Sequence, residues 1–220
     1  MKRLLVGVVV AWFMLGALAQ AEPTLSQRVA QIDQTLQAND MALAQYTWQQ
    51  QEVITVNGSV KKQVLYQVKP IAGALPQRSL VGRDNSRLSP SDETYAEQIA
   101  LLAASYAQPQ PGKLVQLLNQ GNVIVNPTDA PHVVSVDVQS YIKQGDDCTI
   151  VFNNETNQIV SIKVASFLTD PLSMVHINAQ YAQLPEGVNH VATLRVDGLS
   201  NSLVISEQNL NYQLLPRGGH

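Results

Sequence analysis

Hydrophobic residues recur with a helical period near the start of the chain and with a period of two over most of the remainder. The first pattern predicts an amphipathic helix that begins at Thr24 and ends near Asn39-Asp40, because spacings of four, three and four place apolar side chains on one stripe. Its opposite face is rich in glutamine. The apolar stripe consists of Leu25, Val29, Ile32 and Leu36.

Alternation of apolar and polar residues then predicts a β-hairpin around Asn57-Gly58-Ser59. The apolar faces match if Trp48 pairs with Val68 and Val56 pairs with Val60. A two-residue loop without a bulge would shift this register by one residue and turn apolar side chains to the polar face. We therefore expect a longer loop or a β-bulge. The apolar positions are Tyr46, Trp48, Ile54 and Val56 on one strand and Val60, Val64, Tyr66 and Val68 on the other.

Two more helices are predicted in the middle of the chain. The segment from Ser89 to Glu93 offers a cap, a proline in the first turn and acidic residues at the positive end of the helix dipole. A second short helix is expected around residues 114–118, and Gly121 is its expected left-handed end.

Residues 134 to 214 are expected to form a series of strands, because apolar residues alternate between turn signals. Sequential strands with short connections predict an antiparallel meander. Each strand is apolar on one face only, so helices must cover one side of the sheet. The predicted fold class is α+β: a curved antiparallel sheet, a half-barrel, covered on its concave side by a few helices. A closed barrel is the alternative. Leu210, Tyr212 and Leu214 also indicate a change of phase or a bulge in the last strand.

The first 21 residues have the pattern of a cleaved secretory signal peptide. Lys2 and Arg3 precede an apolar run of residues 4–19, and Ala19-Gln20-Ala21 fits a signal peptidase site. The run is shorter than the roughly 20 residues of a spanning helix. We therefore expect residues 22–220 to form a single exported, periplasmic α+β domain with no membrane span after cleavage.

Charge and cysteine content exclude several classes of partner and structure. Loss of Lys2 and Arg3 takes the formal net charge from −3 to −5. The remaining basic residues are scattered, so nucleic acid is not an expected partner. The single cysteine, Cys148, cannot form an intrachain disulfide, and it cannot carry a lipid next to the predicted cleavage site. We interpret it as a small buried apolar residue, with a reactive thiol as the alternative.

No motif for catalysis or metal binding is present in the sequence. The chain has four histidines, none within a metal-binding spacing of another. It has no nucleophile elbow of the Gly-x-Ser-x-Gly type. The carboxylate pairs Asp92-Glu93 and Asp146-Asp147 are explained by a helix start and a turn. We expect a protein that is not an enzyme and that has no cofactor.

The segment Gln45-Tyr46-Thr47-Trp48-Gln49-Gln50, followed by Gly58, resembles the opening of the periplasmic lipoprotein-carrier (LolA/LolB-like) fold. A second resemblance, to a group of exported bacterial proteins, covers most of the chain. The residues that carry it are the Tyr46-Thr47-Trp48 start of the first strand, the turns at residues 143–146 and 184–187, and the corner at residues 167–171. The first resemblance implies a lipid or a lipoprotein acyl chain as ligand; the second implies no activity.

Aromatic residues on the predicted sheet faces are the candidate ligand-binding residues. They either pack in the core or line an apolar cavity. Two functions stay open: a carrier of an apolar or lipid ligand, and a protein-interaction or envelope-maintenance domain that binds an envelope protein. Arg78, Arg83 and Arg87 form either a solvated loop or a carboxylate or phosphate clamp. The aromatic candidates are Trp48, Tyr66, Phe152, Phe167 and Tyr181.

Overall fold

The computed structural model describes residues 24–71, 74–107, 110 and 112–215. The elements in chain order are α1 (Leu25–Leu43), β1 (Tyr46–Val56), β2 (Ser59–Ile71), β3 (Ala74–Leu80), α2 (Pro90–Ala107), α3 (Lys113–Asn119), β4 (Val123–Pro127), β5 (Val133–Gln139), β6 (Asp147–Asn153), β7 (Gln158–Phe167), β8 (Met174–Gln183), β9 (Asn189–Gly198), a 3₁₀ turn (Leu199–Asn201) and β10 (Leu203–Leu214).

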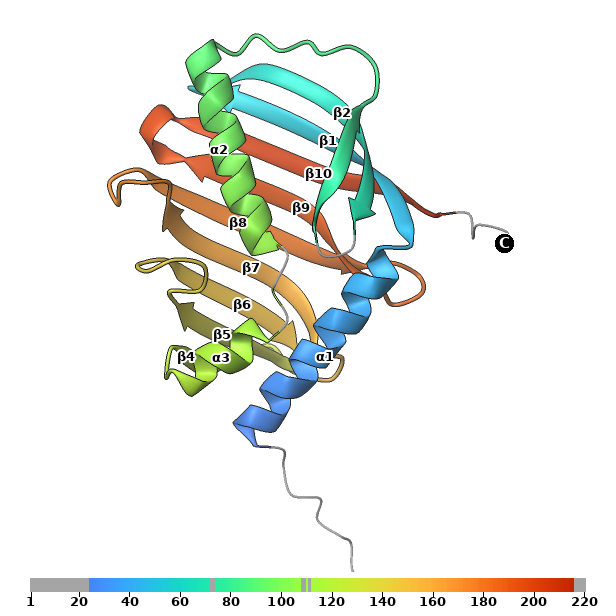
Figure 1. Cartoon of the computed structure of the whole chain (residues 1–220), viewed down its shortest axis with the longest axis vertical. Coiled ribbons are helices and arrows are strands. Elements are labelled where there is room, and N and C mark those ends of the chain that lie inside the picture. Colours follow the sequence, from blue (N-terminus) through green and yellow to red (C-terminus); the bar gives the residue numbers. More distant parts are fainter. Residues whose placement is uncertain (1–23, 72–73, 108–109, 111, 216–220) are drawn as a thin grey trace, which may run out of the picture.

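All the described strands join one sheet of ten strands in the order β3-β2-β1-β10-β9-β8-β7-β6-β5-β4. Every neighbouring pair is antiparallel. The sheet is open, with β3 and β4 at its two edges, so the alternative of a closed barrel is wrong (Figure 1). The predicted fold class, an α+β half-barrel, is confirmed.

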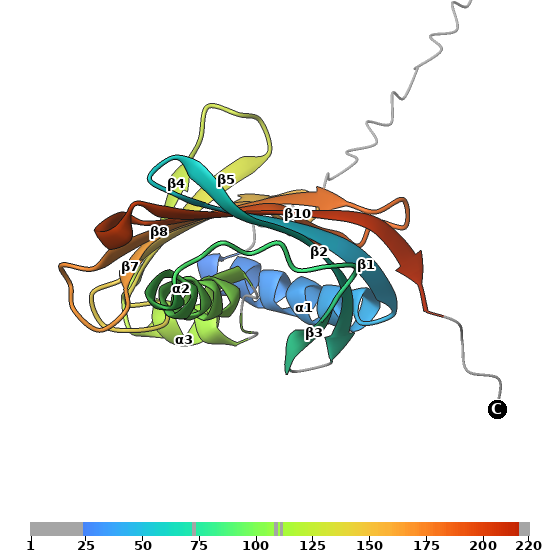
Figure 2. The same cartoon turned by 90° about the horizontal axis from the view of Figure 1, so that it is seen from above.

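The three helices lie on the concave side of the curved sheet (Figure 2). Helix α2 packs on β7 to β10, whereas α1 packs on α3, β7 and β9. This arrangement buries the inner faces of the central strands, and the α2 residues Ile99, Ala103 and Tyr106 are fully buried among them. The apolar core therefore lies between the helices, the strands from β5 to β10 and the end of β1.

Helix α1 begins as predicted but is longer than predicted. Thr24 and Gln27 form a reciprocal capping box at its start. The expected end at Asn39-Asp40 is wrong, because the helix continues to Leu43. The Asn39 side chain donates to the carbonyl of Asn189 at 2.8 Å and accepts from its amide at 2.6 Å. Asn39 is thus used to attach the helix to β9, and it does not terminate the helix.

The register of the β1–β2 hairpin is partly as predicted. Trp48 pairs with Val68, which confirms the matched apolar faces. The predicted pairing of Val56 with Val60 is wrong, because Val56 pairs with Ser59. The apolar faces are aligned by a bulge and not by a longer loop.

A two-residue turn closes this hairpin. Asn57 and Gly58 have φ angles of 50° and 75°, and positive values at both positions are typical of a type I′ turn. The register then shifts opposite Ile54 and Thr55 so that Lys61 is the extra residue. A second shift occurs between β1 and β10, next to Asn211 with a φ of 54°. It confirms the phase change predicted in the last strand.

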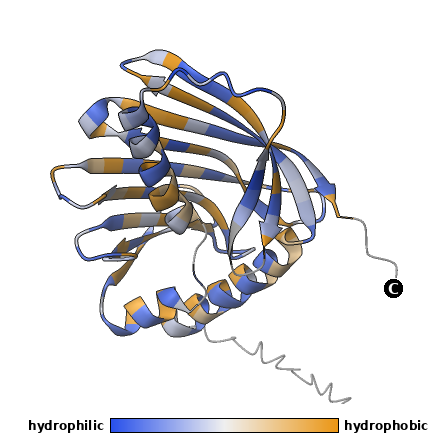
Figure 3. Cartoon of the chain, turned by 45° about the horizontal axis from the view of Figure 1, so that its top comes forward, coloured by the Kyte–Doolittle hydropathy of each residue, from blue (hydrophilic) through white to orange (hydrophobic). Residues whose placement is uncertain are grey.

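Apolar and polar residues alternate along most strands, as the hydropathy colouring shows (Figure 3). This alternation changes at one end of the concave face. In β1, the inward-facing residues Ile54 and Val56 belong to the apolar core, but the two that precede them in the same row, Gln50 and Glu52, are polar. That end of the concave face holds the candidate site.

Candidate ligand site on the concave face

Strand β1 places two polar side chains in its buried row. Every second residue from Tyr46 to Val56 is buried, so Gln50 and Glu52 face inward together with Trp48 and Ile54. Only 3% of the surface of Glu52 is exposed. Burying a carboxylate is costly unless it is paired and hydrogen-bonded, so the partners of Glu52 define the site.

Four charged residues from four strands meet around this position. Arg78 Nη1 on β3 lies 3.4 Å from Glu52 Oε2 and 3.2 Å from Glu207 Oε1 on β10. Lys62 Nζ on β2 lies 3.2 Å from Glu52 Oε1. Gln50 donates to Glu207 Oε2 at 3.0 Å and accepts from Arg78 at 2.9 Å. We call these five residues the Arg78 network.

The contact between Arg78 and Glu207 shows how strongly the sheet curls. Strands β2 and β1 lie between β3 and β10 in the sheet. In a flat sheet, these two strands would be about 14 Å apart, at roughly 4.8 Å per neighbouring pair. The 3.2 Å contact therefore requires β3 to fold over the concave face, and β3 lies on the same side as the helices in Figure 2. At this end, a strand and not a helix covers the sheet.

The network has an unusual electrostatic balance because two carboxylates face each other. Glu52 and Glu207 are direct partners in the β1–β10 ladder. Burial raises the pKa of Glu207 to about 7, and the nearby charge of Glu52 adds to this rise, whereas Arg78 opposes it. Glu52 Oε1 lies 3.2 Å from Lys62 Nζ, and no further partner is close to it among the described residues. Because a carboxylate oxygen has two lone pairs, it can accept one more hydrogen bond.

Aromatic rings lie next to the Arg78 network. The Trp48 and Tyr212 rings stack with centroids 5.2 Å apart, and the His190 ring lies 4.2 Å from Tyr212. Trp48 Nε1 donates to the Asn209 side chain at 3.1 Å. The guanidinium of Arg78 lies over the Tyr66 ring, 5.1 Å from its centroid. The site thus combines flat apolar surfaces with hydrogen-bonding groups.

The structure brings together two of the five aromatic residues predicted to bind a ligand. Trp48 and Tyr66 lie at the Arg78 network. Phe152 is fully buried in the apolar core. The Tyr181 hydroxyl donates to the carbonyl of Ala107 at the end of α2, at 2.7 Å. Phe167 alternates with inward-facing residues of β7 and therefore lies on the other face of the sheet. Ligand binding by these residues stays a prediction.

The sequence analysis missed Gln50, Glu52, Glu207 and Tyr212 as residues of this site. The signal for the first two was present, because positions 46, 48, 50, 52, 54 and 56 share one face in any regular strand. Only the apolar members of that row were used in the prediction. Arg78 was singled out, but its partners on β1 and β10 depend on the curl of the sheet.

Comparisons with known proteins found likenesses among solved structures. No family model matches the chain, and no curated protein matches it. Among solved structures, it is similar to an outer membrane lipoprotein-sorting protein domain from Vibrio parahaemolyticus. That likeness has a TM-score of 0.49 and 7% identity, and covers 89% of this chain and 95% of the other. A DUF1329 family protein from Desulfovibrio piger gives a TM-score of 0.45 at 9% identity, covering 87% and 93%.

These two likenesses are of fold alone, and with TM-scores below 0.5 they carry no argument about what this chain binds. Evidence about function comes from the site itself.

Outside the candidate site, the thiol of Cys148 and the metal-ligating side chains are the other groups in the described part of the chain that could support chemistry. Cys148 is buried, and burial raises the pKa of its thiol to about 12, so the reactive thiolate is disfavoured. No three His, Cys, Asp or Glu side chains in residues 24–71, 74–107, 110 and 112–215 are placed to hold a metal ion. None of the described helices is both long and apolar enough to cross a membrane.

Proposed function

We propose that the protein is an exported, non-catalytic binding protein that holds an amphipathic, lipid-class ligand at the Arg78 network. One observation carries the proposal: a folded-over edge strand covers this end of the concave face, where aromatic rings lie beside hydrogen-bonding groups. Trp48 and Tyr66 offer surface for the apolar part of the ligand. Arg78, Gln50 and the second lone pair of Glu52 Oε1 offer partners for its polar part.

The position of β3 provides a route to the site. Strand β3 is an edge strand that pairs with β2 alone, and the contacts of Arg78 join it to β1 and β10. Ion pairs of this kind contribute modestly when they are partly exposed, and 36% of the Arg78 side chain is exposed. A ligand that displaces Arg78 must offer new partners to Glu52 and Glu207, because only 5% and 9% of their side chains are exposed.

Trp48 makes the proposal directly testable. The chain has two tryptophans, and the other, Trp12, lies in the predicted signal peptide, so Trp48 is the only one in a chain that begins at Glu22. Fatty acids or phospholipids brominated on the acyl chain quench tryptophan fluorescence on contact. We expect saturable quenching of Trp48 and, in native mass spectrometry of protein from a periplasmic extract, one bound lipid. Absence of both results would reject the proposal.

A matched pair of variants locates the binding surface. Tyr66 and Phe167 are both half-buried aromatic residues of the sheet, but they lie on opposite faces. Tyr66→Ala should raise the Kd for the brominated lipid by about three- to tenfold, because an aromatic contact is lost. Phe167→Ala should leave the Kd unchanged. Equal effects of the two substitutions would place the ligand elsewhere.

A further inference from the structure

A short segment continues along the edge of β2 beyond the end of β3. Residues 81–87, which we call the strap, are joined to β2 by two backbone hydrogen bonds. Val81 N donates to the carbonyl of Leu65, and Arg87 N donates to that of Lys61, both at 2.7 Å. The strap therefore begins and ends in contact with the same strand.

Between these two bonds, the strap bows away from β2. The strap advances six residues while β2 advances four, which corresponds to roughly 20 Å and 13 Å of extended chain. Gly82, with a φ of +96°, lies at the start of the bow. The backbone of Gln63 faces the same edge as Lys61 and Leu65, yet no hydrogen bond joins it to the strap among the described residues. An open groove of about 630 Å³ results.

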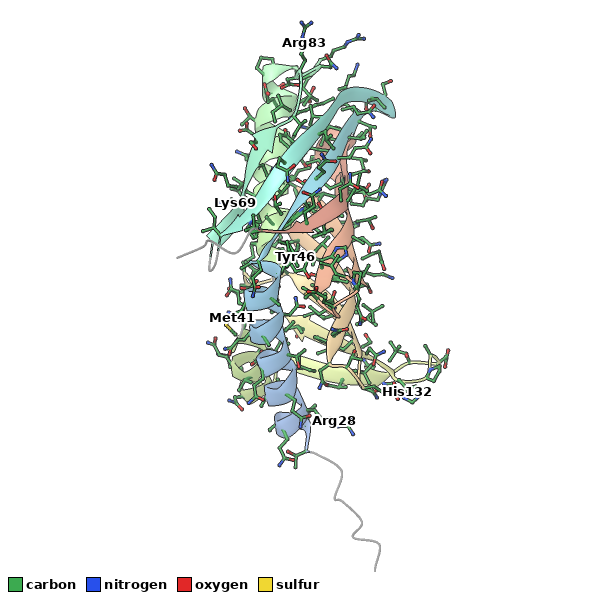
Figure 4. The ribbon with its side chains drawn as sticks, turned by 90° about the vertical axis from the view of Figure 1, so that its right-hand side faces the viewer. Arg28, Met41, Tyr46, Lys69, Arg83 and His132 are labelled. Atoms are coloured by element: carbon green, nitrogen blue, oxygen red, sulfur yellow. The ribbon has the colours of Figure 1, made fainter. Side chains whose placement is uncertain are left out.

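The charged residues that line the groove are all cations. Lys62 is paired with Glu52, but the side chains of Lys61, Arg83 and Arg87 have no ion-pair or hydrogen-bond partner within the described ranges. Asp84 lies in the strap but does not line the groove, and its carboxylate accepts from the amide of Ser86. Figure 4 labels Arg83 at the end of the molecule. The lining residues are Gln51, Val60, Lys61, Lys62, Gln63, Val64, Leu65, Val81, Arg83, Asn85 and Arg87.

This concentration of charge is not expected from composition, because the chain has more acidic than basic residues. Like charges held around one groove repel each other unless an anion lies between them. Arginine and lysine together offer many hydrogen-bond donors to tetrahedral oxyanions. The backbone N–H of Gln63, which makes no hydrogen bond to the strap, adds one more. We propose that the groove is a binding site for a phosphate group.

An extended acidic peptide fits the groove less well. A peptide that added a strand to β2 would need a free edge of about five residues. The two hydrogen bonds of the strap occupy that edge at Lys61 and Leu65, which leaves only the short stretch around Gln63. A compact anion can enter without displacing the strap.

The groove and the Arg78 network share Lys62. Lys62 is one of the lining residues of the groove, and its ammonium lies 3.2 Å from Glu52 and 5.9 Å from the centroid of the Tyr66 ring. A phosphate in the groove would therefore sit next to the proposed apolar site. The phosphate has two possible sources. It is the headgroup of the amphipathic ligand, in which case the inference rests on the proposed function, or it is free phosphate, in which case the inference is independent of that function.

A charge-matched pair of variants tests the inference. The groove variant carries Lys61→Gln, Arg83→Gln and Arg87→Gln. The control carries Lys69→Gln, Lys163→Gln and Arg195→Gln, which remove the same charge from side chains that do not line the groove. The probes are inorganic phosphate, followed by calorimetry, and vesicles of phosphatidylcholine with or without phosphatidylglycerol, followed by sedimentation. Circular dichroism confirms that both variants fold.

We expect the groove variant to bind more weakly by about fivefold for each cation removed, with the control unchanged. Loss of phosphate binding identifies a free anion as a ligand, and a loss seen only with phosphatidylglycerol vesicles identifies a lipid headgroup. Equal binding by both variants, or no binding of either probe by the wild-type protein, would overturn the inference. Quenching of Trp48 by a brominated neutral amphiphile is scored separately, because it tests the proposed function without the groove.

Discussion

At the scale of single residues, the candidate site depends on a pair of carboxylates that sequence rules would keep apart. Like charges directly opposite each other on neighbouring strands destabilise a sheet. Glu52 and Glu207 occupy such positions, and Arg78 compensates by lying within 3.4 Å of both. The arrangement leaves Glu207 easier to protonate than an ordinary carboxylate.

The raised pKa of Glu207 predicts a specific dependence of stability on pH. Its pKa is 4.5 as a free side chain and about 7 in the folded protein. Between these values the folded state binds the proton more tightly, so the contribution of Glu207 is fully present below about pH 4.5 and is lost as the pH rises through 7. Glu207→Gln should reduce the fall in the free energy of unfolding between pH 5 and 7 by on the order of 1–3 kcal/mol.

Urea denaturation of the wild-type protein and of Glu207→Gln at several pH values measures this difference. The other titratable groups, the buried His190 among them, are present in both proteins and cancel in the comparison. Glu97→Gln removes an exposed carboxylate and is the control. A pH profile of Glu207→Gln parallel to that of the wild-type protein would contradict the prediction.

At the scale of elements, the edge strand β3, which we call the flap, pairs with β2 and is joined to β1 and β10 through Arg78. Arg78→Met keeps a long apolar stem but removes the contacts with Glu52, Glu207 and Gln50. The loss should be on the order of 1–2 kcal/mol, because solvent screens a guanidinium that is about one-third exposed. The backbone amides of β3 should then exchange with deuterium about tenfold faster, whereas those of β8 should not change.

Arg195→Met provides the matched control for the flap. Arg195 also pairs with a carboxylate, that of Asp197, but both residues lie on β9. Its substitution removes an arginine ion pair without connecting two strands across the sheet. If the amides of β3 exchange equally fast in both variants, Arg78 does not hold the flap.

Local signals in the sequence were sufficient for most elements but not for the site. The helical spacing of apolar residues after Thr24 and the alternation around Asn57-Gly58 predicted α1 and the first hairpin, because these signals act over a few residues. The continuation of α1 past Asn39 could not be predicted, since it depends on Asn189. The partners of Arg78 depend on the curl of the whole sheet, which no local pattern specifies.

At the scale of the whole molecule, the last strand, β10, connects the first hairpin of the chain to the strands that follow the helices. Strand β10 lies between β1 and β9, so the hairpin of β1 and β2 is attached to the rest of the sheet through it. The meander predicted from sequence describes β5 to β10 correctly, but it does not include β4 (Val123–Pro127). The pairing of β1 with β10 joins segments that are far apart in the sequence. The Arg78 network can assemble only when β10 is in place, because Glu207 belongs to it.

A pair of proline substitutions tests whether β10 is required for this architecture. Val204 of β10 pairs with Thr55 on one side and Asp197 on the other, so proline there breaks the ladder of a central strand. Val125 lies on the edge strand β4, two residues before the natural Pro127, at a position whose amide faces away from the sheet.

Val204→Pro should lower the free energy of unfolding by on the order of 3 kcal/mol or prevent folding, and the fluorescence emission of Trp48 should shift to the red as water reaches the ring. Val125→Pro should unfold at nearly the same urea concentration as the wild-type protein. If Val204→Pro shows the same Trp48 emission maximum and the same unfolding transition as the wild-type protein, then β1 and its site form without β10.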